Sequence, residues 1–70
     1  MIWNNYVGKQ VFIILNNNRR YSGIFKEAEF IGKDSFGADM YIISIIDKFG
    51  KWVSFSSKEI ELIDEEERRW

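Results

Sequence analysis

The stretch LNNNRRYSG, residues 15–23, joins an apolar run to an alternating one and decides how the chain folds. The run before it, residues 11–15, is rich in β-branched and aromatic residues and predicts a strand buried on much of both faces. Three asparagines follow and predict a hairpin turn, because asparagine tolerates the left-handed conformation and bonds to nearby backbone. From residue 19 to residue 26 the side chains alternate. Gly23 lies inside this second strand and marks a bend, a bulge or a close backbone approach.

Three further strands are predicted. Residues 40–46, MYIISII, give the strongest signal, with only Ser44 polar. Residues 47–50, DKFG, fit a turn with Asp first and Gly last, and residues 51–56 alternate again. After a short polar break, in which Ser57 is the expected cap, residues 60–63 form a brief last strand.

The remaining segments are expected to lack regular strands. Residues 30–38 read as a long loop in which Phe30, Ile31 and Phe36 pack back onto the body. The N-terminus leaves room only for a short element around Trp3 and Tyr6. The domain is expected to span residues 1–64, followed by a charged tail at residues 65–70.

Five short antiparallel strands in 70 residues predict an all-β fold, a small, strongly bent five-stranded barrel. The four-residue turn between strands three and four disfavours an OB-fold, which often carries a helix there. A chain this short buries only about 60% of its unfolded surface, so its core must be efficient. No cysteine supplies a disulfide, and self-association is the expected source of extra stability.

The composition limits the functions that are open to the chain. The net charge of −1 argues against broad, non-specific binding to DNA. Histidine and cysteine are absent, so we expect no enzyme activity, no metal site and no cofactor. No apolar run has the length of a transmembrane helix and no signal peptide is visible, so a cytoplasmic protein without membrane contact is expected.

The segment VGKQVFIILNNNRRYSG resembles the first motif of the Sm-like (LSm) RNA-binding proteins. The positions that match run from residue 8 to residue 23: Gly8, Lys9, Val11, Ile13, Leu15, Arg19, Tyr21 and Gly23. A weaker match to the second motif, FSSKEIELI, carries Phe55, Ile60 and Ile63. The resemblance implies an Sm-like barrel that assembles into a ring of six or seven subunits and holds single-stranded RNA without doing chemistry on it. A different SH3-like barrel remains the alternative.

The resemblance implies an RNA site at positions where this chain departs from the family pattern. The family's aspartate falls at Glu29, and no asparagine precedes strand three, where Asp39, Met40 and Tyr41 stand. Its Arg-Gly pair is replaced by Ser56 and Ser57. The candidate RNA-binding residues are Glu29, Asp39, Tyr41, Ser56, Ser57 and Lys58. A protein-interaction or structural module that has lost the RNA pocket is therefore the alternative function.

Self-association is expected through strands four and five, which pair between neighbouring subunits in the family. No proline guards these strands, and an unprotected sheet edge is a template for pairing. Three tryptophans, Trp3, Trp52 and Trp70, are also too many to be buried in so small a core. At least one is therefore expected at the surface, as a candidate marker of an interface. The candidate interface residues are Trp52, Val53, Ile60 and Leu62. The ligand is expected to be RNA, an RNA-associated partner or another protein.

Overall fold

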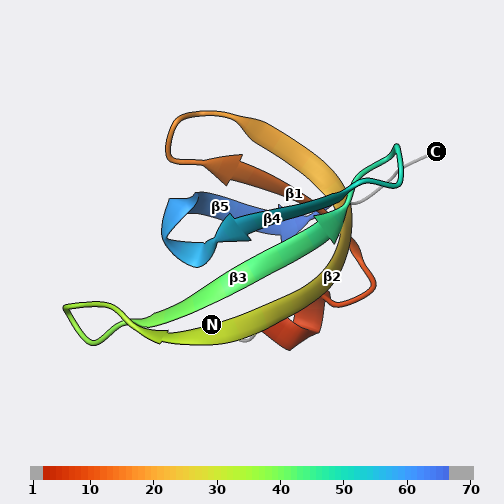
Figure 1. The fold of residues 1–70 in the computed structure, drawn as a ribbon. Coiled ribbons are helices and arrows are strands. Elements are labelled where there is room, and N and C mark those ends of the chain that lie inside the picture. Colours follow the sequence, from red (N-terminus) through yellow and green to blue (C-terminus); the bar gives the residue numbers. More distant parts are fainter. Residues whose placement is uncertain (1–2, 67–70) are drawn as a thin grey trace.

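The computed structural model describes residues 3–66 and shows an all-β chain with one five-stranded antiparallel sheet. A short 3₁₀ helix leads into the sheet, and a second one joins its last two strands (Figure 1). The elements in chain order are η1 (Trp3–Tyr6), β1 (Gln10–Leu15), β2 (Arg20–Lys33), β3 (Asp39–Ile46), β4 (Trp52–Ser56), η2 (Ser57–Glu59) and β5 (Ile60–Glu65). No helix among these residues is both long and apolar enough to cross a bilayer.

The strand order is β4-β3-β2-β1-β5, so the predicted strands four and five form the two edges of the sheet. Within residues 3–66 these two edges are not paired with each other. The sheet curves so that β1 and β5 lie over β3 and β4 (Figure 1). The last strand is longer than predicted and reaches Glu65. The backbone N–H of Glu66 then donates to the carbonyl of Gln10 (2.8 Å), while the rest of the expected tail, with Trp70, lies outside the described residues.

The turn predicted at the three asparagines is confirmed. Leu15 and Arg19 close it through a backbone hydrogen bond of 2.9 Å, and Asn18 takes the left-handed conformation with φ 68°. The second half of the prediction, at Gly23, is confirmed as a close backbone approach. A Cβ atom placed there would collide with the carbonyl oxygen of Ile46 and lie 2.9 Å from its carbon.

The long loop predicted over residues 30–38 is shorter than predicted: residues 34–38 form a turn, but residues 30–33 belong to strand β2, so the segment is the far part of a hairpin. Strand β2 continues to Lys33 and pairs with β3 from Ile24 to Lys33, with bulges at Lys26 and Ile31. Strand β1 pairs with β2 only through Ile24, and β4 pairs with β3 only as far as Ile42. The part of the hairpin beyond these pairings, residues 30–41, projects from the body and is called the hairpin arm (Figure 1). Phe30 and Ile31 are exposed, and Phe36 is 92% exposed rather than packed against the body.

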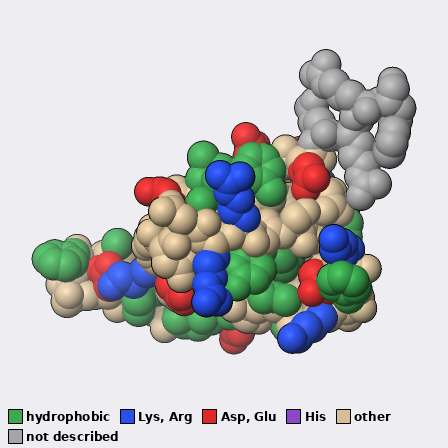
Figure 2. All heavy atoms as spheres, turned by 90° about the horizontal axis from the view of Figure 1, so that it is seen from above, with side chains coloured by type: hydrophobic (Ala, Val, Ile, Leu, Met, Phe, Trp, Pro, Cys, Tyr) green, Lys and Arg blue, Asp and Glu red, His purple; other side chains and the backbone are tan. Residues whose placement is uncertain are grey.

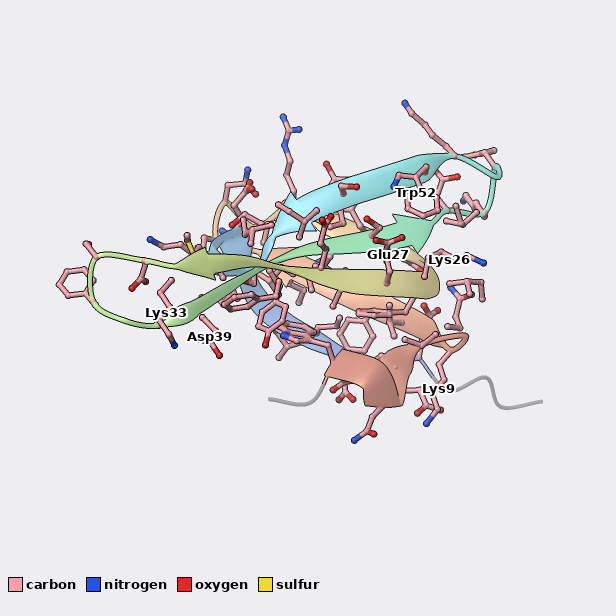
Figure 3. All side chains as sticks on the ribbon, turned by 60° about the horizontal axis from the view of Figure 1, so that its bottom comes forward. Lys9, Lys26, Glu27, Lys33, Asp39 and Trp52 are labelled. Atoms are coloured by element: carbon pink, nitrogen blue, oxygen red, sulfur yellow. The ribbon has the colours of Figure 1, made fainter. Side chains whose placement is uncertain are left out.

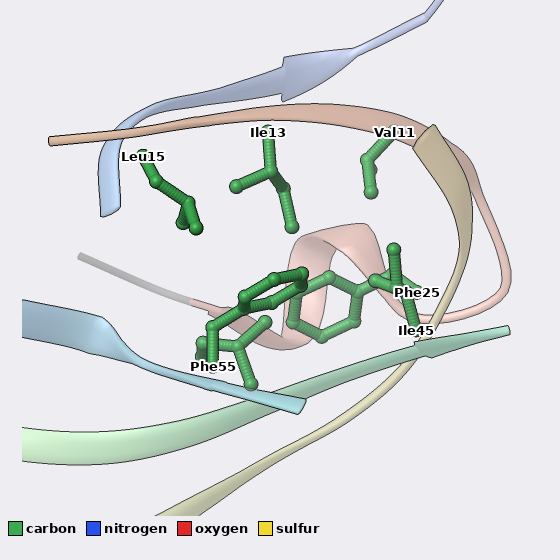
Figure 4. Close-up of a cluster of buried hydrophobic side chains, with 7 residues drawn as sticks. Val11, Ile13, Leu15, Phe25, Ile45 and Phe55 are labelled. Atoms are coloured by element: carbon green, nitrogen blue, oxygen red, sulfur yellow. The ribbon is translucent and has the colours of Figure 1, made fainter. Parts of the chain in front are cut away.

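The core lies on the concave face of the sheet, and its residues come from strands β1 to β4 (Figure 4). Strand alternation places one side chain in two on this face. Two aromatic rings of the N-terminal helix close it, because Trp3 stacks on Phe25 (6.4 Å between centroids) and Tyr6 also contacts Phe25 (5.9 Å). The buried members are Val11, Ile13, Leu15, Phe25, Ile43, Ile45 and Phe55.

Replacing Gly23 with alanine tests the close approach. The added methyl group meets backbone atoms of Ile46, which cannot move aside as a flexible side chain would. We expect Gly23→Ala to lower the free energy of unfolding by about 1–3 kcal/mol, the usual cost of overpacking. Urea denaturation measures this loss, and Ser35→Ala, at an exposed turn position, serves as the control with a change within about 0.5 kcal/mol. An unchanged midpoint for Gly23→Ala contradicts the prediction.

Candidate binding cleft and exposed turns

A cleft of about 610 Å³ opens where the hairpin arm meets β5. It brings together three of the predicted RNA-binding residues, Asp39, Tyr41 and Ser57, although they come from β3 and η2. Two predicted interface residues of β5, Ile60 and Leu62, form part of its wall. The other residues that line it are Trp3, Lys33, Gly37, Glu61 and Ile63.

Tyr41 is the central ring of the cleft. Its ring lies 6.0 Å from that of Trp3 and 5.6 Å from that of Phe30, measured between centroids. Its backbone N–H, which lies beyond the end of the β3–β4 pairing, donates to the hydroxyl oxygen of Ser57 (3.0 Å). Ser57 therefore ties η2 to β3, and this bond fixes the polar wall of the cleft next to the aromatic rings.

The charged groups of the cleft are partly neutralised. Lys33 and Asp39 are opposite each other in the β2–β3 register, and Lys33 Nζ donates to Asp39 Oδ1 at 2.6 Å. This carboxylate raises the pKa of Lys33. Figure 3 shows both side chains on the face that carries η1. Glu61 adds a second, exposed carboxylate, so the cleft has more negative than positive charge.

The structure separates the other predicted RNA-binding residues from this cleft. Glu29 pairs with Ile42, which puts it on the opposite face of the sheet from Asp39 and Tyr41. Ser56 caps η2: its hydroxyl oxygen accepts from the N–H of Lys58 (3.3 Å), while Glu59 accepts from the N–H of Ser56 (3.2 Å). The cap therefore lies one residue before the predicted Ser57. Lys58 Nζ lies 3.7 Å from Asp34 Oδ2 and does not line the cleft.

The predicted interface residues differ in their exposure to solvent. On β4, Trp52 is 51% exposed on the convex face, whereas Val53 is half-buried against the core. On β5, Leu62 is 44% exposed and Ile60 is half-buried. One member of each edge strand is thus available for contact, and the other belongs partly to the core.

Sequence reasoning missed that the two ends of β3 carry the same turn. The segments DSFGA (residues 34–38) and DKFGK (residues 47–51) share the pattern Asp-x-Phe-Gly-x. In each turn the Asp side chain accepts two backbone N–H groups, from the Phe and from the last residue, at 2.8–3.0 Å. Each glycine has a positive φ, 81° at Gly37 and 79° at Gly50.

Both turns present their phenylalanine to solvent. Phe36 is 92% exposed and Phe49 is 83% exposed. The hydrogen bonds of each turn are made by aspartate, glycine and backbone groups, so turn formation does not require the aromatic ring. In Figure 2 the hairpin projects as an arm that ends in hydrophobic atoms.

Within residues 3–66 the acidic side chains do not gather in a group that could hold a metal ion. No protein-family model matches the chain, and comparisons with curated proteins and with solved structures give no match. The cleft and the exposed turns are therefore interpreted from their own geometry.

The pKa of Asp34 allows a test of the hairpin turn. The N–H groups of Ala38 and Phe36 stabilise the carboxylate and lower its pKa below 3.8. A lowered pKa in the fold means that Asp34 stabilises the turn at pH values above 3.8, and that this contribution is lost as the pH falls through the lowered pKa. We expect the amide NMR signals of Phe36 and Ala38 to titrate together in this acid range. In Asp34→Asn, which has no titrating group, the two signals should stay constant, and a titration that persists there would contradict this assignment.

Proposed function

We propose that the chain is a non-catalytic, Sm-like β-barrel protein that forms homo-oligomers and holds single-stranded RNA. The observation that carries the proposal is the cleft, in which the rings of Tyr41 and Trp3 lie beside the Ser57 wall. Stacking of bases on aromatic rings is the common way in which proteins hold unpaired nucleotides. The resemblance of residues 8–23 to the first Sm motif supports the same class of ligand.

The sheet order supports the oligomeric part of the proposal. The edge strands β4 and β5 each offer a row of backbone groups that have no strand partner on one side within residues 3–66. Pairing of β4 of one subunit with β5 of the next would supply hydrogen-bond partners for these groups. The sheet would then continue from one subunit to the next through the assembly. Trp52 and Leu62 would then be partly covered.

Solution mass tests the assembly. We expect light scattering to give a multiple of 8.4 kDa for the wild type. An edge-blocked variant carries Trp52→Lys on β4 and Glu61→Lys on β5. The two lysines would repel each other where β4 of one subunit meets β5 of the next, so the mass should fall to that of the monomer. Val7→Lys, an equally exposed position outside both edges, is the control that should leave the mass unchanged. A measured mass of 8.4 kDa for the wild type at every concentration contradicts the proposed homo-oligomer.

An RNA titration tests the ligand. Fluorescence anisotropy with oligo-uridine and oligo-adenosine in low salt should show binding at micromolar protein. Loss of one stacking ring costs about 1–3 kcal/mol, so Tyr41→Ala should weaken binding by about fivefold or more. Tyr6→Ala removes a comparable half-buried ring that does not line the cleft, and it controls for lost stability. Absence of binding to both oligomers contradicts the proposal.

A second function is favoured by the charge of the cleft. Asp39 and Glu61 repel phosphate groups, and Lys33, the one lysine among the described residues that line the cleft, is already paired. An SH3-like module that binds a protein segment would gain from these carboxylates when the segment carries lysine or arginine. Binding of a basic peptide without binding of either RNA oligomer would favour this second function.

A further inference from the structure

One wall of the cleft is an ion pair between Lys33 and Asp39, whose side chains lie on the face of the sheet that carries η1 (Figure 3). These are the last two residues that β2 and β3 pair before the turn of the hairpin arm. The turn keeps the strands in register, because the backbone N–H of Asp34 donates to the carbonyl of Ala38 (2.9 Å). The backbone pairing therefore sets the position of the ion pair in the cleft.

Both members of the ion pair keep hydrogen-bonding capacity for a ligand. Their side chains are 62% exposed at Lys33 and 47% exposed at Asp39. The ammonium group of Lys33 has further N–H donors besides the one that Asp39 Oδ1 accepts, and the carboxylate of Asp39 has further lone pairs. The pair thus offers a donor and an acceptor side by side at one edge of the cleft.

The ring of Tyr41 lies next to this edge. Tyr41 follows Asp39 by two residues along β3, so both side chains are on the same face of the sheet, about 7 Å apart along the strand. A base that stacks on Tyr41 can therefore direct its Watson–Crick edge to Asp39 and Lys33. The cleft, at about 610 Å³, has a volume within the range of about 300–1,000 Å³ that is usual for small-ligand sites.

The order of donor and acceptor at this edge distinguishes the bases. Guanine presents a carbonyl oxygen beside two N–H donors, so Lys33 can donate to O6 while the carboxylate of Asp39 accepts from N1 and N2. Uracil presents one N–H between two carbonyl oxygens, and its second oxygen would face the carboxylate. Adenine and cytosine each offer the carboxylate a single amino group. Guanine is therefore the base that gains the most hydrogen bonds from the pair.

The excess of negative charge in the cleft fits the same kind of contact. Asp39 and Glu61 repel phosphate groups, but their oxygens accept hydrogen bonds from N–H groups. A strand that inserts a base with N–H donors, and keeps its phosphates outside the cleft, avoids this repulsion. The carboxylates then favour a base edge and disfavour the backbone.

We propose that Asp39, together with Lys33, makes the cleft select an unpaired guanine base of single-stranded RNA. This inference rests on the proposed RNA-binding function and assigns the base that the cleft prefers. Tyr41 supplies a stacking surface that accepts any base. Asp39 is the specificity-determining residue, because its carboxylate reads the two N–H donors that only guanine presents together.

Fluorescence anisotropy tests the selection with uridine oligomers that differ only in the central base. Central guanosine should bind about tenfold more tightly than central uridine, the effect of one bidentate contact. Central inosine, which lacks only the N2 amino group, should bind about fivefold more weakly than guanosine. Equal binding of all three overturns the selection but leaves the proposed RNA-binding function intact. Absence of binding to every oligomer contradicts both.

Asp39→Asn separates recognition from stability. The amide has nearly the shape of the carboxylate but one acceptor oxygen and no charge, so the guanosine preference should fall from about tenfold to about twofold or less. Binding of the all-uridine oligomer should stay equal or become tighter, because Lys33 is then free to attract phosphate. A loss of stability would instead weaken the binding of both oligomers.

Glu29→Gln is the matched control, since it removes a carboxylate on the opposite face of the sheet from Asp39. This variant should keep the guanosine preference at about tenfold. An undiminished preference in Asp39→Asn, or an equal loss in Glu29→Gln, overturns the assignment of Asp39.

Discussion

The shape of this molecule depends on the absence of a side chain at Gly23. There β2 passes so close to the end of β3 that the carbonyl of Ile46 occupies the space of a Cβ atom. This approach lets the half of β2 that pairs with β1 turn back over the half that pairs with β3. The two halves then enclose Phe25, whose ring also receives Trp3 and Tyr6.

The sequence alone predicted the strands well where local chemistry determines them. Alternating and apolar runs identified all five, and the asparagines and the DKFG segment identified two of the turns. The hairpin arm was missed because its far part contributes no side chain to the hydrophobic core, so its residues show no regular inward-outward alternation. The repeated Asp-x-Phe-Gly pattern was a signal that could have identified the arm, since residues 34–38 repeat the turn recognised at residues 47–50.

The cleft could be predicted only in part because its geometry depends on register. Asp39, Tyr41 and Ser57 were singled out from the chain, and the fold brings them together. Glu29 was grouped with them by counting from Gly23, but the bulge at Lys26 shifts the register and pairs Glu29 with Ile42 on the other face. Trp3 and Glu61 reach the cleft through tertiary packing, which no local pattern of the sequence indicates.

The hairpin arm and the rest of the sheet also differ in the free energy that their local unfolding requires. Beyond Phe25, strand β2 pairs with no strand other than β3 among residues 3–66, and many of its side chains face water. The backbone N–H groups of the arm should therefore exchange with solvent deuterium through local opening, while those of β1 and the adjoining part of β2 exchange only when the whole domain unfolds. A segment that opens at so low a cost can adapt its path to whatever it contacts without disturbing the core.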